Sequence, residues 1–481
     1  MANEYLYGTY GIIAESVTQH ADDAKTVPVY IGTLPVNLIR GYSDLVNRPV
    51  KLTNYTDAQN KVGISPDWDV FTLCEAIEAH FNNMNGNIGP IYVINVLDPD
   101  THRASDPEST NLAFVNGRAI ILSDKIILDT LALEDKTEGV DYSVSYDFTN
   151  GKVIISSLGD PITGNVMANW YEVDVSGVTE SEIIGGKTAE GVYTGLAVIS
   201  TVYQNLGVIP TLIAAPGWSE IPKVYKAMVN SATKINGHWD AFVLADIPLT
   251  AKTIPDAKKW KKDNEYISER SKVFWPQVIN GGGQKYHLST LAVSEMMRAD
   301  ASHDGIPMET CGNKIISAAA QYFGEDSKNQ GFDDTESREL TSSGISTAVY
   351  WAGNWVLWGD ETAAYEFGTD FDARATFDVN IRMLFHITNS FQREWSSSID
   401  EPFTIQLKDT IINREQSKLD ALVAMGALYG NPTIQFIEAQ NSVADIRSGN
   451  FRWDIAVTPT PPMKSATAYV AYTDAGFTAI V

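Results

Sequence analysis

The sequence predicts a multidomain α/β protein: a doubly wound α/β body, an inserted small β-barrel or sandwich, and an α+β C-terminal domain, with an extended arm at each end. Three observations support this. Apolar strands alternate with amphipathic helices in residues 26–100 and again in residues 181–350, as in parallel sheets covered on both faces. Only short strands and polar turns fill residues 101–180. The chain of 481 residues also exceeds one typical hydrophobic core.

The composition excludes several classes of partner and site. A net charge of −25 argues against nucleic acid, because phosphate binding relies on clustered Lys and Arg. There is no run of about 18 apolar residues, so we expect no membrane insertion, and the N-terminus lacks the pattern of a secretory signal. Cys74 and Cys311 are too few for a disulfide framework or a zinc site. We therefore expect a reducing cytoplasm and no metal or cofactor.

The first part of the body reads as strand, helix and strand. Residues 27–32, VPVYIG, form a short apolar run that ends in glycine, and residues 69–81 carry apolar side chains at helical spacing. Residues 91–97, IYVINVL, are almost wholly apolar, which is typical of a strand buried on both faces. This order predicts a βαβ unit.

The inserted segment does not continue this alternation of strands and helices. Its short strands are separated by polar or glycine turns, among them Asn150-Gly151. Asn-Gly between alternating residues is a strong hairpin signal, so residues 101–180 predict an all-β domain.

The second part of the body, residues 181–350, returns to alternating helices and strands. We expect helices over residues 188–206, 219–235, 254–270 and 288–301, and strands over residues 209–217, 239–245 and 272–279.

The stretch from residue 344 to residue 367 is rich in aromatic residues. Three of the 11 tryptophans in the chain lie close together here: Trp351, Trp355 and Trp358. Their spacing suits one helix face, but Gly353-Asn354 between two β-prone runs favours a hairpin with a type II′ turn. In that register Trp351 lies opposite Val356, and Tyr350 lies opposite Leu357. We place this hairpin at the seam between the body and a C-terminal domain.

That C-terminal domain spans residues 351–465. Residues 377–395 and 410–428 predict two amphipathic helices, and residues 433–439 and 451–457 predict strands. A Pro-rich spacer follows at residues 458–462.

Both ends of the chain read as β-prone arms, residues 1–25 and 466–481. The N-terminal segment is either a frayed terminus or a strand that pairs with another sheet. The aromatic and aliphatic residues that would take part in such pairing at the two ends are Tyr5, Tyr7, Tyr10, Tyr469, Tyr472, Phe477 and Ile480.

One pattern suggests catalysis. Ser346 lies in Gly-Ile-Ser-Thr-Ala, similar to the G-T-S-x-A of subtilisin-like peptidases, and Asp246 and His303 precede it in the Asp, His, Ser order. The flanking residues differ from those peptidases, however, and Ser346 leads into a strand-like run. A nucleophile needs free backbone N–H groups nearby for an oxyanion hole, which a mid-strand serine lacks. We therefore predict no catalytic residues and no enzyme activity.

Several segments together resemble the tail sheath proteins of contractile-tailed bacteriophages and related phage-tail-like particles. Residues 7–11 followed by residues 27–33 resemble the arm and first strand of that family. Residues 286–313 resemble its segment running from Ser-Thr-Leu-Ala to Asp, Gly-Ile-Pro and Asn, and residues 346–362 resemble its G-N…W-G-x-x-T hairpin. The order and spacing of these segments extend over nearly the whole chain.

The resemblance implies a structural protein whose body is similar to subtilisin in fold without being a peptidase. It implies arms that pair with neighbouring subunits, building hexameric rings that stack into a helical tube. The implied partners are an inner tail tube protein, baseplate proteins and tail terminator proteins. The implied location is the tail of a virion or tail-like particle assembled in the host cytoplasm, and the implied action is contraction. A subtilisin-fold serine hydrolase and a static self-assembling protein are the alternative interpretations.

Overall fold

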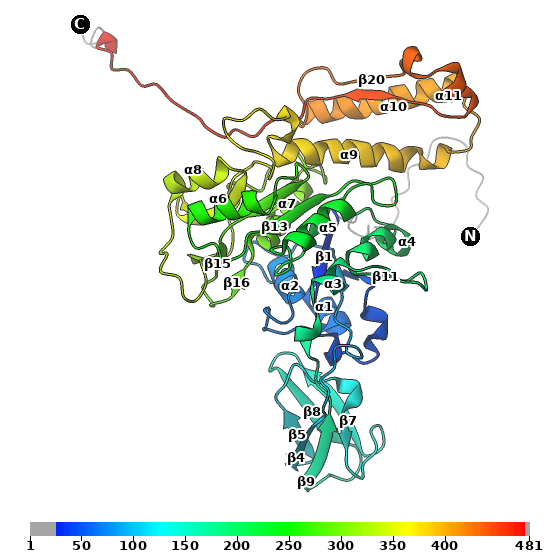
Figure 1. The fold of residues 1–481 in the computed structure, drawn as a ribbon, viewed down its shortest axis with the longest axis vertical. Helices are drawn as coiled ribbons and strands as arrows, with labels where there is room; N and C mark the ends of the chain where they lie inside the picture. Colours follow the sequence, from blue (N-terminus) through cyan, green and yellow to red (C-terminus); the bar gives the residue numbers. More distant parts are fainter. Residues whose placement is uncertain (1–25, 477–481) are drawn as a thin grey trace, which may run out of the picture.

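The computed structural model describes residues 26–476, and its centre is one eight-stranded sheet (Figure 1). In spatial order its strands are β19 (Asn354–Trp358), β18 (Ile345–Trp351), β14 (Ser271–Phe274), β13 (Phe242–Asp246), β12 (Leu212–Ala214), β1 (Pro28–Gly32), β3 (Ile91–Asn95) and β2 (Pro49–Leu52). The six inner strands are parallel, and the two edge strands β2 and β19 pair antiparallel. The mixed α/β prediction is confirmed.

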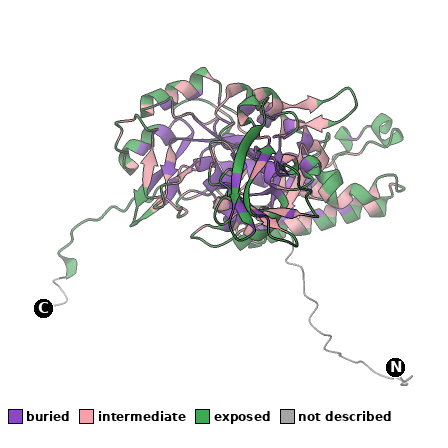
Figure 2. Cartoon of the chain, turned by 90° about the horizontal axis from the view of Figure 1, so that it is seen from below, coloured by how far each residue is buried: buried purple, intermediate pink, exposed green. Residues whose placement is uncertain are grey.

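Helices cover both faces of this sheet. Helices α2 (Leu73–Phe81) and α7 (Leu288–Ser302) pack against each other on one face. The other helices of the body are α1 (Tyr55–Val62), α3 (Glu180–Ile184), α4 (Val202–Leu206), α5 (Pro222–Ser231), α6 (Ile254–Asp263) and α8 (Asp334–Thr341). Alternate residues of β14 face opposite sides: Val273 packs in the apolar cluster of Ala257 and Leu340, whereas Phe274 packs in the cluster of Leu291. The buried residues concentrate in this body (Figure 2).

Short strands complete the body. They are β10 (Gly186–Lys187), β11 (Tyr193–Thr194), β15 (Gln277–Ile279), β16 (Lys285–Tyr286) and β17 (Ala320–Tyr322). Two elements expected from the sequence differ from the structure in this region. The strand expected over residues 272–279 is divided between the main sheet and a three-stranded sheet, because Pro276 has no N–H with which to continue the ladder.

The helix expected over residues 188–206 is also wrong. Strands β10 and β11 form a hairpin, a 3₁₀ helix spans Gly195–Thr201, and only Val202–Leu206 is α-helical. Gly195 explains the difference: its φ is +57°, and a Cβ there would lie 2.5 Å from the carbonyl oxygen of Glu182. A positive φ does not occur within a continuous right-handed helix, and the close approach to Glu182 leaves room for glycine alone.

Two three-stranded antiparallel sheets project from the body (Figure 1). They contain β4 (Glu108–Phe114), β9 (Gly164–Trp170) and β6 (Ala132–Leu133) in one sheet, and β5 (Arg118–Ile121), β8 (Lys152–Ser157) and β7 (Tyr142–Asp147) in the other. They enclose an apolar cluster that includes Leu112, Val153 and Trp170. At the root of this β unit, the Asn37 side-chain amide donates to the carbonyl oxygens of Asp124 and Ile126, each at 2.9 Å.

The C-terminal unit lies at the opposite end of the body (Figure 1). It consists of α9 (Asp378–Trp395), α10 (Ile405–Ala424), α11 (Val443–Arg447), β20 (Thr433–Gln435) and β21 (Asp454–Ala456). Met383 and Ile387 of α9 pack with Leu419 and Leu422 of α10 in a separate apolar cluster. No helix within residues 26–476 has the length and apolar character needed to cross a membrane.

The tryptophan hairpin forms, but its predicted register is wrong. Trp351 pairs with Asn354 and Tyr350 pairs with Trp355, so the turn residues are Ala352 and Gly353. Both have positive φ, 49° and 89°, as a type I′ turn requires, and this turn matches the right-handed twist of the strands. Strand β18 also pairs with β14, so a boundary at residue 351 would cut the hairpin. The body sheet instead ends at Trp358.

Candidate functional site

The three residues of the hydrolase pattern have separate partners. The Ser346 hydroxyl, buried in β18, donates to the Gly359 carbonyl oxygen at 3.3 Å, and its own carbonyl accepts from the Trp275 N–H at 3.0 Å. His303, beyond the end of α7, lies 3.0 Å from the Glu309 carboxylate. No hydrogen bond joins Asp246, His303 and Ser346 within the described chain. This arrangement lacks the nucleophile–base contact that a triad needs.

A buried polar cluster occupies the carboxyl ends of β12 and β13. Asp246 accepts hydrogen bonds from the N–H of Ser289, at 3.1 Å, and from its hydroxyl, at the start of α7. Burial raises the pKa of Asp246 to about 6. Next to it, His287 Nδ1 lies 2.7 Å from Glu75 Oε2, and its Nε2 lies 3.5 Å from Glu220 Oε1. No local sequence pattern indicates this cluster, because Glu75 and His287 are 212 residues apart.

The charges of this cluster are complementary. Burial opposes the positive charge of His287, but the surrounding carboxylates, Glu75 first, outweigh it and raise the pKa of His287 well above its usual value. Within residues 26–476, no three His, Cys, Asp or Glu side chains are arranged to hold a metal ion. The cluster therefore joins α2 and α7 to the end of the sheet as a structural ionic group.

Helix α9 is attached to the body by buried charges. Lys272 Nζ lies 2.7 Å from Asp378 Oδ2, and both side chains are fully buried. One helical turn further on, Arg382 pairs with Asp300 of α7. Near the end of the helix, the Asn389 side chain accepts from the Asp240 N–H at 3.1 Å and donates to the Asp240 carbonyl oxygen at 2.8 Å.

Both ends of the described chain have contacts near the junction between α9 and the body. The Thr26 hydroxyl donates to Asp300 at 2.6 Å, and Lys464 pairs with the buried carboxylate of Glu361. Beyond Lys464 the chain runs outward with almost fully exposed side chains, at 96% for Tyr469 and 84% for Tyr472 (Figures 1 and 2). The other predicted pairing residues lie outside the described residues: Tyr5, Tyr7, Tyr10, Phe477 and Ile480.

The hairpin aromatics lie on the edge of the main sheet. Trp351 and Trp358 have ring centroids 5.6 Å apart, and Tyr350 and Trp355 have theirs 5.8 Å apart. Tyr350 is 61% exposed and Trp351 is 44% exposed, whereas Trp355 packs against the body core. The tip of the hairpin thus presents an exposed aromatic surface at the edge of the main sheet.

A small two-stranded sheet, β20–β21, covers α10. Within the described residues, β20 has no strand partner other than β21. The Gln416 side chain of α10 accepts from the Ile434 N–H at 3.4 Å and donates to the Pro432 carbonyl oxygen at 2.9 Å, so a further strand would have to pair with a short edge that already has side-chain contacts.

Comparison with known proteins identifies chains that are similar in sequence and in fold. The chain is 24% identical over 491 aligned positions to the tail sheath protein of Burkholderia phage BcepMu, covering 97% of this chain and 96% of that protein. Over almost its whole length, the chain is similar to a phage tail sheath protein. No family model matches the chain.

Solved structures share the fold. The contracted helical sheath of the anti-feeding prophage aligns with 98% of this chain at a TM-score of 0.56 and 13% identity, covering all of that chain. The contracted sheath complex of PVC, an extracellular contractile injection system, aligns with 98% of this chain and 99% of that one, at a TM-score of 0.55 and 14% identity. These sheath homologues and neighbours are structural proteins and not enzymes, which bears out the prediction of a non-enzymatic protein and confirms the sheath resemblance.

Lys272→Met should lower the free energy of unfolding by about 3–5 kcal/mol, because it leaves the Asp378 carboxylate buried without its partner. The double variant Lys272→Met/Asp378→Leu should recover most of that loss. Urea denaturation of both variants measures this. Equal losses in the two variants would mean that packing, rather than charge pairing, holds α9 here.

His287→Gln tests the polar cluster through pH. Because the folded-state pKa of His287 lies above 6.5, the stabilisation by its charge is fully present below pH 6.5 and is lost as the pH rises through the folded-state value. The stability difference between wild type and variant should therefore be about 2 kcal/mol at pH 6 and shrink at alkaline pH. Denaturation series at several pH values measure it.

The control for this series is His238→Gln, at an exposed histidine that forms no ion pair within residues 26–476. A stability difference for His287→Gln that stays constant with pH would show that His287 carries no charge in the folded protein.

Proposed function

We propose that this protein is the structural subunit of a contractile tail sheath, which polymerises as hexameric rings stacked into a helical tube around an inner tail tube. The observation that carries the proposal is the similarity to a tail sheath protein over almost the whole length of both chains. The exposed C-terminal tail supports it, because an extended segment without intramolecular packing suits a role between subunits.

We infer that the subunits are linked by added strands. The tail around Tyr469 and Tyr472 is extended and exposed, and β20 has no strand partner other than β21 among the described residues. Pairing the tail of one subunit with the outer edge of β20 in a neighbour satisfies the backbone groups of both. Because donor and acceptor surfaces differ, such contacts continue from subunit to subunit and build a helical lattice. Residues 1–25 would supply the second link.

Contraction would follow from the same connections. An extended sheath is proposed as a kinetically trapped state, released at the baseplate, in which subunits rotate outward as rigid bodies and bury more surface. The strand links keep the lattice connected while the subunits rotate. The other proposed partners are the inner tube and the tail terminator, and assembly takes place in the host cytoplasm.

The proposed layout uses the opposite ends of the body. The C-terminal unit, through residue 465, faces the inner tube, and the inserted domain of residues 101–180 lies outside, on a body that we propose is subtilisin-like. The projection of the β unit away from α9 and α10 supports this arrangement (Figure 1).

Purified protein should form hollow striated tubes in negative-stain electron microscopy. Removing residues 466–481 should abolish the tubes with little change in unfolding midpoint, because the described part of this tail is exposed. Removing residues 1–20 should likewise prevent polymerisation.

A matched variant for the C-terminal deletion keeps the tail at its full length. The triple variant Ala468→Pro/Val470→Pro/Ala471→Pro removes backbone N–H donors on both edges of the tail without changing charge, so it should also prevent tube formation. Tubes formed by this proline variant would rule out strand pairing by the tail, and peptidase activity lost in Ser346→Ala would favour the hydrolase instead.

An epitope inserted at two exposed turns tests the layout. Inserted between Asn150 and Gly151, it should leave tubes intact and bind antibody along their outer surface. Inserted between Asp400 and Glu401, between α9 and α10, it should bind antibody on dispersed subunits but not along tubes. Labelling in the opposite pattern would reverse the proposed orientation.

A further inference from the structure

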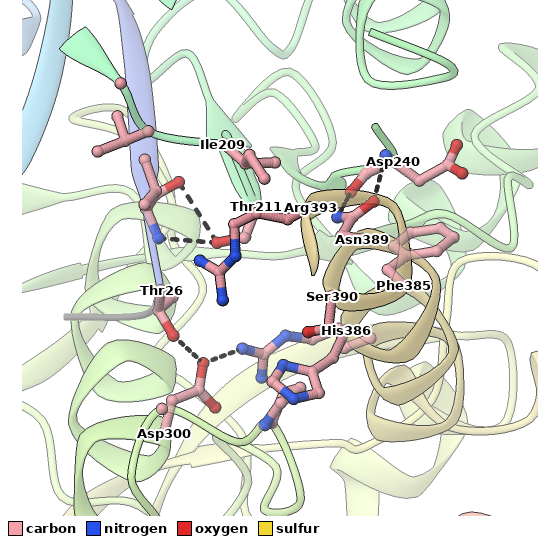
Figure 3. A pocket seen from close by; sticks show the side chains of 16 residues that line it. Thr26, Ile209, Thr211, Asp240, Asp300, Phe385, His386, Asn389, Ser390 and Arg393 are labelled. Carbon is pink, nitrogen blue, oxygen red and sulfur yellow. Dashed lines mark hydrogen bonds and ion pairs between the residues drawn. The ribbon is translucent and has the colours of Figure 1, made fainter. Parts of the chain in front are cut away.

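A cavity of about 270 Å³ lies beside Thr26, where the described chain begins (Figure 3). Its walls are formed by Thr26 and Val27 just before β1, by residues within 207–211, by the end of α7 with the loop after it, and by one face of α9. The residues that α9 contributes recur at helical spacing: Arg382, Phe385, His386, Asn389, Ser390 and Arg393.

The charges that line this cavity do not balance. Asp240 pairs with Arg270 at 2.6 Å and with Lys234 at 3.4 Å, and Asp300 pairs with Arg382. Arg393 also lines the cavity and reaches toward it from α9 (Figure 3), but it forms no ion pair with any residue in the range 26–476. One positive charge in the cavity wall is therefore available to an acidic ligand.

Two buried polar atoms in the same wall also lack partners in the described structure. They are Arg382 Nη1, on a residue that is 5% exposed, and Asp300 Oδ1, on a residue that is 1% exposed. Leaving such atoms unsatisfied is costly, since buried polar groups are nearly always hydrogen-bonded. A donor and an acceptor side by side suit a peptide segment that carries a carboxylate, because its side chain accepts and its backbone N–H donates.

The chain itself supplies such a segment. Asp22 and Asp23 precede Thr26 by four and three residues, and an extended chain covers about 3.5 Å per residue. Residues 22 and 23 can therefore lie at most about 10–14 Å from Thr26, which itself lines the cavity. Residues 22–25, Asp-Asp-Ala-Lys, carry a net charge of −1 that complements Arg393.

We propose that the Asp22–Asp23 pair binds in this cavity, with carboxylate hydrogen bonds to Arg393 and Arg382. Charge-assisted pairs between guanidinium and carboxylate groups are among the stronger hydrogen bonds in proteins. This anchor fixes the direction in which the N-terminal segment leaves the body, next to the contacts that hold α9. The inference rests on the cavity and its charges and does not depend on the sheath function.

Cleavage after Lys25 by lysyl endopeptidase tests the anchor on dispersed, full-length subunits. Binding of Asp22–Asp23 shields the neighbouring Lys25–Thr26 bond, and cleavage by a protease follows the population of the released state. Asp22→Asn/Asp23→Asn should speed this cleavage about tenfold, as should Arg393→Gln, whose exposed position leaves the fold intact. Mass spectrometry of the product that begins at Thr26 measures the rate.

Three controls make the result specific. Glu15→Gln removes an acidic side chain farther along the same segment and should leave the rate unchanged. Tenfold dilution of the subunits should also leave it unchanged, because the contact is within one chain. Arg393→Asp should speed cleavage, and adding Asp22→Arg/Asp23→Arg to it should restore protection.

The proposal is overturned by any of three results. An unchanged rate in Asp22→Asn/Asp23→Asn, together with a raised rate in Arg393→Gln, would identify another occupant. Protection that disappears on dilution would identify a neighbouring subunit as the source of the carboxylate. Failure of the charge-reversed combination to restore protection would remove the ion pair from the explanation.

Discussion

The buried ion pairs between the body and α9 are the interaction on which the rest of the architecture depends. Lys272 and Asp378 are fully buried, and Arg382 and Asp300 nearly so. A buried charge is tolerated only next to its partner, so each pair fixes a position and an orientation that apolar packing alone would leave adjustable. Asn389, which holds both backbone groups of Asp240, fixes a third point along the helix.

Both ends of the described chain are connected to the contacts between the body and α9. Thr26 bonds to the same Asp300 that pairs with Arg382, and Lys464 pairs with Glu361, whose carbonyl oxygen lies 3.4 Å from Lys272 Nζ. In the proposed sheath, a pull on either arm would therefore reach the contacts that hold α9. A subunit built in this way would transmit force between its neighbours while its sheet stays rigid.

The carboxyl ends of the parallel strands are where open α/β sheets commonly bind ligands. In this protein Asp246, which accepts hydrogen bonds from Ser289, and the ion pair of His287 with Glu75 fill that position. Ser346 lies in a strand whose backbone groups are already paired. A fold of this kind can carry a catalytic site in other proteins, because function depends on the residues of a site and not on the fold. In this protein, structural contacts occupy the position where such a site would lie.

The sequence by itself determined the local elements. The apolar run of β3, the helical spacing of α2 and the strand position of Ser346 follow from short-range patterns, and the mixed α/β class follows from their order. Tertiary structure alone decided what depends on distant partners. The hairpin turn lies at Ala352-Gly353 because β18 and β19 twist together as the edge of the main sheet. The helix expected over residues 188–206 is interrupted at Gly195, whose φ is positive. Lys272 and Asp378 are 106 residues apart, so no local pattern reveals that each neutralises the other.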